Sequence, residues 1–215
     1  LSAIALAKTL QLRTVEIPSS VTEIGIGPFL GSINLIEVIN HSSAELKFVF
    51  DPNDLPGELG GEIGLLTVLL NLSSPVVHSD ETSRIVDVDG FRFINDGETD
   101  FLFDYVGDSV DLVFPTSYNG GHYVIRPLSF FLRSDITSAV IAGDIEIGPM
   151  SFVGCFGLKQ LTVGAGASLA LDGFDLTVNG DLVVNGRLRA SATERIRVAG
   201  DVAFAAQSFV KDHST

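Results

Sequence analysis

The feature of this sequence that most constrains its fold is an internal repeat of 22–23 residues. Leu12 lies 23 residues before Leu35, and Val15 lies 23 residues before Val38. Further along the chain an apolar pattern recurs after 22 residues, with Ile125, Phe130, Arg133, Ile136, Ala139 and Ile141 preceding Ile147, Phe152, Cys155, Leu158, Leu161 and Val163. A unit of this length cannot bury its own apolar face, so consecutive units have to stack. The repeat therefore predicts a solenoid.

Each coil of this solenoid is expected to contain a short strand. Residues 160–163 alternate polar and apolar side chains, which is typical of a strand with one buried face. Stacked coils pair such strands in parallel, and we expect this pairing around Val15, Val38, 139–141, 161–163 and 182–184. The predicted fold class is mostly β, a solenoid of irregular leucine-rich repeats with 22–23-residue coils. Phe29, Phe130 and Phe152 are expected to be buried at equivalent positions of its coils.

Three stretches of the chain carry a resemblance to a known family. They read IPSSVTEIGIGPFLGSINLIEV at 17–38, FPTSYNGGHYVIRPLSF at 114–130 and IGPMSFVGCFGLKQLTV at 147–163. These stretches resemble the BspA-like leucine-rich repeats of bacterial surface proteins, although Asn40 replaces an apolar strand residue and Arg133 stands where a small residue or cysteine is usual. The resemblance implies a surface or secreted protein that mediates adhesion or protein–protein contact.

The chain divides into four predicted segments. Residues 1–84 hold N-terminal repeats, the last of them degenerate, with a strand expected at the alternating Leu46, Phe48 and Phe50 and a buried turn or short helix at 63–72. Residues 85–114 alternate around the turn signals Asp89-Gly90 and 95–97, which predicts an acidic β-hairpin or meander inserted between repeats. Residues 115–163 are repeats again.

The fourth segment, residues 164–215, allows two interpretations. Its string DLTVNGDLVVNGRL at 175–188 contains two Asn-Gly pairs, which are strong signals for tight hairpins. However, Leu176 lies 22 residues before Val198 and Leu161 lies 21 before Leu182, close to the coil length of the repeats. This spacing favours β-helix-like coils that continue the stack.

The charge of the chain excludes some partners. Its 27 acidic and 13 basic residues give a formal net charge of -14, which opposes binding to nucleic acid and to anionic membrane surfaces. Residues 51–111 hold 14 acids and only two arginines, as expected of a solvated face or a docking surface. The longest near-apolar run, 63–72, is about half of what spans a bilayer, so no membrane insertion is expected.

No residue pattern points to catalysis or to a cofactor. Cys155 has no histidine near it in sequence and falls on an interior wall of the repeat, and the four histidines lack zinc spacing. The acids at 95–100 could bind calcium but do not match the EF-hand pattern, so we predict no metal site. We expect no enzyme, with a carbohydrate-active β-helix enzyme as a less favoured alternative.

The expected function is therefore contact with a protein partner, either a host protein or a cell-surface protein, at an extracellular or cell-surface location. Strand positions that point outward would carry this contact, namely Thr14, Glu16, Glu37, Val140, Gln160 and Thr162. An alternative is a structural scaffold or assembly subunit that stacks on other chains, because the ends of a solenoid are sheet edges that must be capped or paired. Self-association through the solenoid ends belongs to this alternative.

Overall fold

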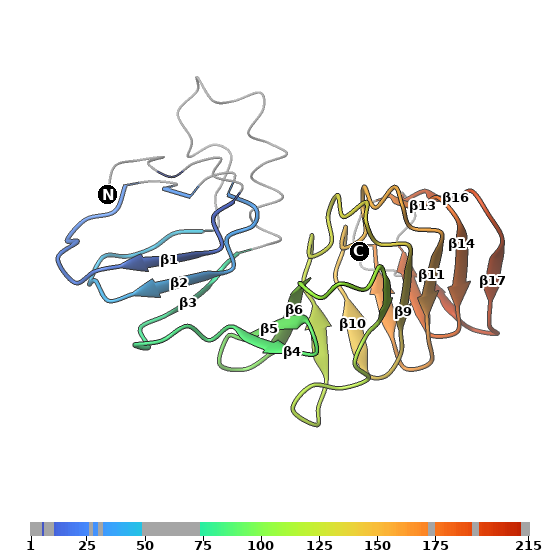
Figure 1. The fold of residues 1–215 in the computed structure, drawn as a ribbon, viewed down its shortest axis with the longest axis horizontal. Helices are drawn as coiled ribbons and strands as arrows, with labels where there is room; N and C mark the ends of the chain where they lie inside the picture. The colour runs from blue at the N-terminus through green and yellow to red at the C-terminus, as the bar shows by residue number, and fades with distance from the viewer. Residues whose placement is uncertain are drawn as a thin grey trace, which may run out of the picture. The chain divides into compact units, whose positions relative to one another are not determined.

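A computed structural model describes residues 6, 11–25, 28–29, 32–48, 74–171, 175–190 and 194–211. Residues 209–211 are described by their backbone alone. The chain forms two compact units (Figure 1). Unit 1 comprises Leu1–Arg84, and unit 2 comprises Ile85–Thr215.

Unit 1 contains a three-stranded parallel sheet. Its strands, in sheet order, are β1 (Thr14–Ile17), β2 (Glu37–Asn40) and β3 (Val76–His78). Val15 lies opposite Val38, which in turn lies opposite Val77. The parallel pairing predicted around Val15 and Val38 is confirmed.

The core of unit 1 gathers on one side of this sheet. Phe29 is buried, as predicted, together with Leu35 and Val38. Leu46 and Phe48 pack against this cluster, and the ring of Phe48 stacks on Phe29 with 5.9 Å between centroids. Residues 44–48 nevertheless form no strand: their alternation serves packing on the core, and none of the strands that the structure describes pairs with them. The expectations for Phe50 and for residues 63–72 lie outside the described residues.

Unit 2 consists of stacked strands in three sheets. The eight-stranded sheet has the order β18-β15-β12-β10-β8-β6-β5-β4, the five-stranded sheet has the order β17-β14-β11-β9-β7, and β13 pairs with β16. In chain order the strands are β4 (Val86–Val88), β5 (Phe91–Asn95), β6 (Asp100–Tyr105), β7 (Asp111–Val113), β8 (Tyr123–Ile125), β9 (Ser138–Ile141), β10 (Ile145–Ile147), β11 (Gln160–Val163), β12 (Ser168–Ala170), β13 (Leu176–Val178), β14 (Asp181–Val184), β15 (Arg187–Ala190), β16 (Ile196–Val198), β17 (Val202–Phe204) and β18 (Phe209–Lys211).

Each coil of unit 2 crosses from the eight-stranded sheet to the five-stranded one, and Figure 1 shows the coils following one another from β6 to β17. The strands of the five-stranded sheet are parallel, with Leu161 opposite both Ala139 and Leu182. This arrangement confirms the predicted mostly-β solenoid and its parallel register. The third wall is made of turns in the early coils and of β13 and β16 in the last ones.

The C-terminal coils confirm the β-helix-like interpretation over the two hairpins. Strands β14 and β17 pair in parallel, as do β13 and β16. Gly180, from the first Asn-Gly pair, forms a corner between β13 and β14 rather than a hairpin turn. At this corner the chain lies so close to the preceding coil that a Cβ on Gly180 would collide with the backbone of Lys159.

We expect Gly180→Ala to lower the free energy of unfolding of unit 2 by about 1–3 kcal/mol, because the coils have to move apart to admit the methyl group. Gly121→Ala is the matched control, since its Cβ would meet only the carbonyl oxygen of Tyr118 at 3.9 Å. Urea denaturation of both variants measures the difference. Equal stability of the two variants would contradict the close packing at this corner.

Residues 85–114 are predicted to form one insertion between repeats, but the structure divides them between a meander and the first coil. Strands β4, β5 and β6 form the predicted antiparallel meander. Strand β6 also pairs in parallel with β8, and β7 pairs in parallel with β9. The meander therefore continues the eight-stranded sheet, and β7 belongs to the first coil. Tyr105 and Phe114 both pack on the ring of Phe91, so the meander covers the interior of that coil.

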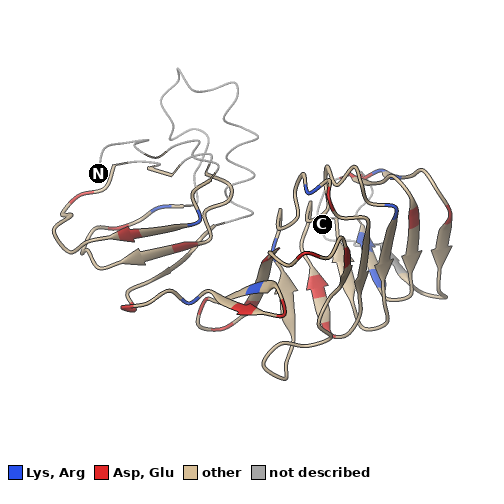
Figure 2. Ribbon diagram, viewed as in Figure 1, with Lys and Arg blue, Asp and Glu red and all other residues tan. Residues whose placement is uncertain are grey.

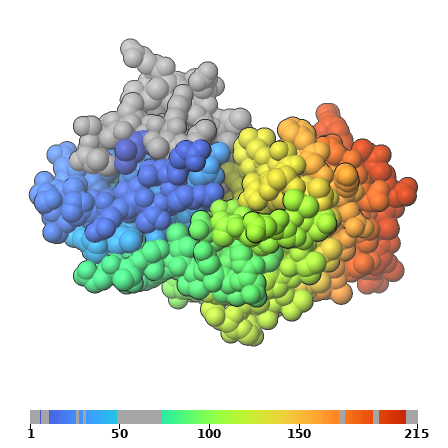
Figure 3. All heavy atoms as spheres, in the orientation of Figure 1, coloured from blue at the N-terminus to red at the C-terminus, as the bar shows by residue number. Residues whose placement is uncertain are grey.

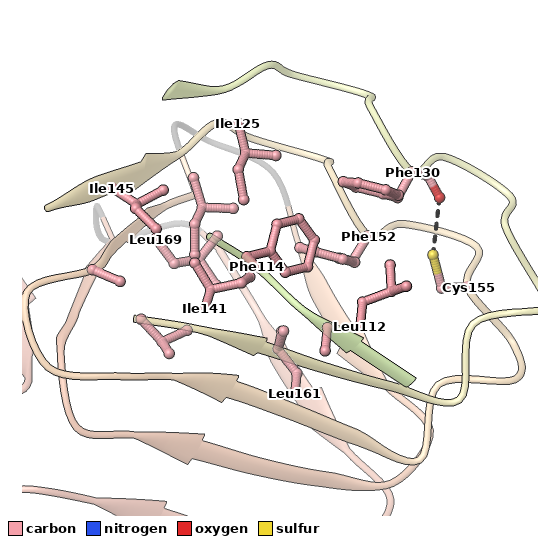
Figure 4. Packing of buried hydrophobic residues seen from close by; sticks show 14 of the residues in the cluster. Leu112, Phe114, Ile125, Phe130, Ile141, Ile145, Phe152, Cys155, Leu161 and Leu169 are labelled. Carbon is pink, nitrogen blue, oxygen red and sulfur yellow. Dashed lines mark hydrogen bonds between the residues drawn. The ribbon is translucent and has the colours of Figure 1, made fainter. Parts of the chain in front are cut away.

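Phenylalanine rings form the centre of the unit 2 core (Figure 4). The rings of Phe130 and Phe152 stack with 5.3 Å between centroids and 5° between planes, and Phe114 meets both edge-on. Phe130 and Phe152 are buried at equivalent positions of successive coils, as predicted. Cys155 donates a hydrogen bond to the Phe130 carbonyl oxygen at 2.9 Å, which ties the two coils together.

Candidate functional site

The outer face of the five-stranded sheet carries a line of small and β-branched side chains. The register aligns one such residue from each strand, and we call this set the outer column: Val113, Val140, Thr162, Val183 and Ala203. Val113 is 71% exposed, Ala203 is exposed, and the three residues between them are half-buried. The column is therefore a continuous apolar strip with one hydroxyl in it, open to solvent along its length.

A polar row runs beside the outer column, on the neighbouring outward positions of the same coils. It consists of Asp111, Ser138, Gln160 and Asp181. The carboxylate of Asp111 accepts hydrogen bonds from the hydroxyls of Thr137 and Ser138, and these bonds lower its pKa. The Asp181 carboxylate accepts a 2.8 Å hydrogen bond from the backbone N–H of Asp201. These two acids thus tie neighbouring coils to one another.

The structure brings three of the six predicted contact residues together. Val140, Gln160 and Thr162 lie on neighbouring strands of this face and point outward, as expected. Thr14 and Glu16 are exposed, but they lie on β1 of unit 1.

Glu37 is the exception, because its side chain is completely buried. Its Oε1 accepts hydrogen bonds from His78 Nε2 at 2.9 Å and from the backbone N–H of Arg84 at 2.6 Å. Its Oε2 accepts one from the Ser83 hydroxyl at 2.7 Å. Residues 79–84 thus cover the outer face of β2 at Glu37. The expectation that Glu37 is free to contact a partner is therefore wrong.

The protonation of this cluster follows from its geometry. The backbone N–H of Asp80 donates to Nδ1 of His78 at 3.2 Å, so the imidazole proton resides on Nε2 and is donated to Glu37. Burial by itself raises the pKa of Glu37, but the hydrogen bonds from Ser83, His78 and Arg84 together outweigh it and leave that pKa below its ordinary value. Glu37 is therefore a buried, fully bonded carboxylate with a structural role.

The members of the outer column that the sequence prediction missed are Val113, Val183 and Ala203. Asp111 lies opposite Ser138, 27 residues later, so the first coil is longer than the repeat and its strand falls out of the regular pattern. The orientation of Val183 depended on whether the neighbouring Asn-Gly pairs form hairpins or corners of a solenoid. The alternation of Leu182 and Val184 with Val183 was the available signal for it.

Cys155 lacks the surroundings of a reactive thiol. It is buried, and burial raises the pKa of the thiol to about 11. At the equivalent position one coil earlier, Arg133 bonds the Asp104 carboxylate at 3.1 Å and the Tyr105 carbonyl oxygen at 3.0 Å. Both residues at this position of the repeat therefore link a coil to the one before it.

The acids at the tip of the β5–β6 turn serve as local hydrogen-bond acceptors. Asn95 accepts from the N–H of Gly97, and Asp96 accepts from the N–H groups of Glu98 and Thr99. Within the described ranges, no group of three or more His, Cys, Asp or Glu side chains is arranged to hold a metal ion. In that same part of the chain, no helix has the length and hydropathy needed to cross a membrane.

Comparisons with known proteins assign no relative: no protein-family model, curated protein or solved structure matches this chain.

Proposed function

We propose that this chain is a non-catalytic binding protein that contacts a protein partner through the outer face of its five-stranded sheet. The observation that carries the proposal is the outer column, an apolar strip that no described element covers. Contiguous exposed apolar surface on a folded protein marks an interaction site more often than chance. The partner is a host or cell-surface protein, and the location is extracellular or at the cell surface, as the resemblance to BspA-like repeats implies.

The structure of the face suits this task. Hydrogen bonds between neighbouring strands and the Asp111 and Asp181 side chains fix the spacing of the outer column. Side chains as short as valine, threonine and alanine lose little conformational entropy when a partner covers them. Outward residues of a solenoid can also vary without harming its core, which allows a specific partner to be selected.

Exchanging one residue at the centre of the face tests the proposal. We expect Val140→Asp to weaken binding of the partner at least about tenfold, because it places a charge in the centre of the apolar strip. Phe156→Asp is the matched control, since Phe156 is as exposed as Val113, at 71%, but lies on the third wall.

The measurement has two steps. First, a cell-surface extract is searched for a protein that the unmodified chain and the Phe156→Asp variant recover but the Val140→Asp variant does not. That protein is then purified and titrated against all three chains by calorimetry. Equal affinity for all three chains, with unchanged circular dichroism, would show that this face is not the contact.

A second candidate function, assembly of a scaffold by stacking on other chains, is favoured by a different observation. Val202 and Phe204 on β17 are 48% and 46% exposed, although they continue two core columns of the solenoid. Such an uncovered sheet edge tends to pair with another strand.

A further inference from the structure

The polar row gives the outer face a negative edge. It contains Asp111 and Asp181, and the hydrogen bond that the N–H of Asp201 donates to Asp181 places Asp201 beside this row on the last coil. Asp111 and Asp201 are exposed, and Asp181 is half-buried. Lys159, directly before Gln160 of the row, adds one positive charge. In Figure 2 red positions lie on the coils of β14 and β17, with a blue one near β11. Three acids against one lysine leave this edge negative.

The opposite side of the outer column is neutral. The residues two positions after the column on the five coils are Pro115, Ala142, Gly164, Asn185 and Ala205. A partner segment on this face therefore meets apolar surface in its middle, negative charge along one flank and small uncharged residues along the other. Such a face attracts basic side chains on one flank of the partner and repels acidic ones.

The dimensions of the face select an α-helix as the segment that fits it. Neighbouring strands lie about 4.8 Å apart, so the outer column is about 19 Å long, and two residues along a strand place the polar row about 6.6 Å from it. In Figure 3 the yellow to red surfaces of successive coils adjoin one another along the stack. An α-helix rises about 5.4 Å per turn and is about 10 Å wide. It therefore offers about one turn per strand and covers both column and row.

An extended segment laid along the same column does not match it. Its side chains on one face recur only about every 6.6 Å, so they fall out of step with strands about 4.8 Å apart. The short side chains of the outer column also let the backbone of a helix approach the sheet closely.

We infer that the partner covers this face with a basic amphipathic α-helix of about 13 residues, whose apolar side lies along the outer column and whose lysines or arginines face Asp111, Asp181 and Asp201. This partner chemistry rests on the proposed function, because it concerns the same face. It adds to it the sign of the charge on the partner and the conformation of the segment that binds.

Fluorescence anisotropy with a labelled synthetic peptide tests the inference on the full chain. The probe is an alanine-based helical peptide of about 15 residues, with leucine at every third or fourth position and lysines along one flank of the leucine stripe. We expect it to bind with a Kd below about 1 mM. Its affinity should fall at least about threefold between about 20 mM and about 300 mM sodium chloride, because salt screens exposed charges.

Two chain variants locate the charges that the peptide meets. Asp181→Asn/Asp201→Asn is expected to weaken binding at least about threefold, and the asparagine at 181 keeps an oxygen that can accept the N–H of residue 201. Asp89→Asn/Glu98→Gln is the matched control, since it removes two charges from exposed positions of the meander. It should leave the affinity unchanged, unless the peptide responds only to the net charge of the chain.

The apolar contact is tested separately by Val140→Ser, which removes apolar surface from the outer column without adding charge. We expect this variant to weaken binding of the lysine peptide at least about threefold. A peptide with glutamate in place of every lysine should not bind, and a scrambled peptide that keeps the composition but loses the leucine stripe should bind more weakly.

Four results would overturn the basic helix: no binding of the lysine peptide, equal binding of the glutamate peptide, an equal loss in the two charge variants, or no loss with Val140→Ser. None of these results touches the proposed function, which fails if the protein recovered from the cell-surface extract binds Val140→Asp as tightly as the unmodified chain. The two failures are therefore distinguishable.

Discussion

Replacing Phe152 with alanine is expected to lower the free energy of unfolding of unit 2 by about 3–5 kcal/mol. The ring is buried, stacks on Phe130 at 5.3 Å and meets Phe114 edge-on. Its removal leaves a cavity between two coils whose backbones are fixed by the strands on either side, so the site cannot collapse to fill it. The loss therefore contains the transfer free energy of the ring and a cavity cost as well.

Tyrosine fluorescence during urea denaturation measures this loss in the right unit. The chain has no tryptophan, and its three tyrosines, Tyr105, Tyr118 and Tyr123, all lie in unit 2. Phe156→Ala is the matched control, because Phe156 is 71% exposed and its truncation should cost less than about 0.5 kcal/mol. A loss below about 1 kcal/mol for Phe152→Ala would show that the stacked rings do not hold the coils together.

The solenoid could be predicted from the sequence wherever the repeat length stays constant. Ile125 and Ile147 occupy the same position of consecutive repeats and are partners in the parallel register, because an unchanged coil length returns each side chain to the same wall. The prediction fails where the coil length changes, as at β7, whose strand pairs with β9 across a longer coil. It also could not place β6 in the solenoid sheet, because the alternation in a meander strand looks the same whether its next neighbour is antiparallel or parallel.

The outer face was predictable where strand alternation alone decides exposure, and this holds for Val140, Gln160 and Thr162. Glu37 shows the limit of that rule. Alternation places it on the outer side of β2, but it says nothing about whether another segment returns to cover that side. Residues 79–84 do so from beyond the next strand of the sheet, and the acceptor atoms that hold them are those of Glu37.

We expect Glu37→Ala to lower the free energy of unfolding of unit 1 by about 3–5 kcal/mol, because several donors lose a charged acceptor and each hydrogen bond to a charged group contributes about 1.5–3 kcal/mol. His78 Nε2, the Ser83 hydroxyl and the Arg84 N–H all lose this acceptor, and His78 is itself only 2% exposed. Hydrogen exchange of residues 76–84 reports on unit 1, which contains no tyrosine. Glu16→Ala is the control, because that side chain is 68% exposed on β1, and its loss should change stability by less than about 0.5 kcal/mol.

The pH dependence separates the charge of Glu37 from its size. Because the folded-state pKa of this carboxyl lies below its ordinary value of 4.5, its stabilising effect is complete above that value and disappears as the pH falls through the lowered pKa. Glu37→Gln keeps the shape but cannot titrate, so the stability difference between the two chains should shrink as the pH falls below about 5. Asp80 and Arg84, which pair with each other beside His78, are the same in both chains, so their own titration largely cancels from this difference. If the difference in unfolding free energy between the two chains stays constant through the acid range, the charge of Glu37 does not contribute to stability.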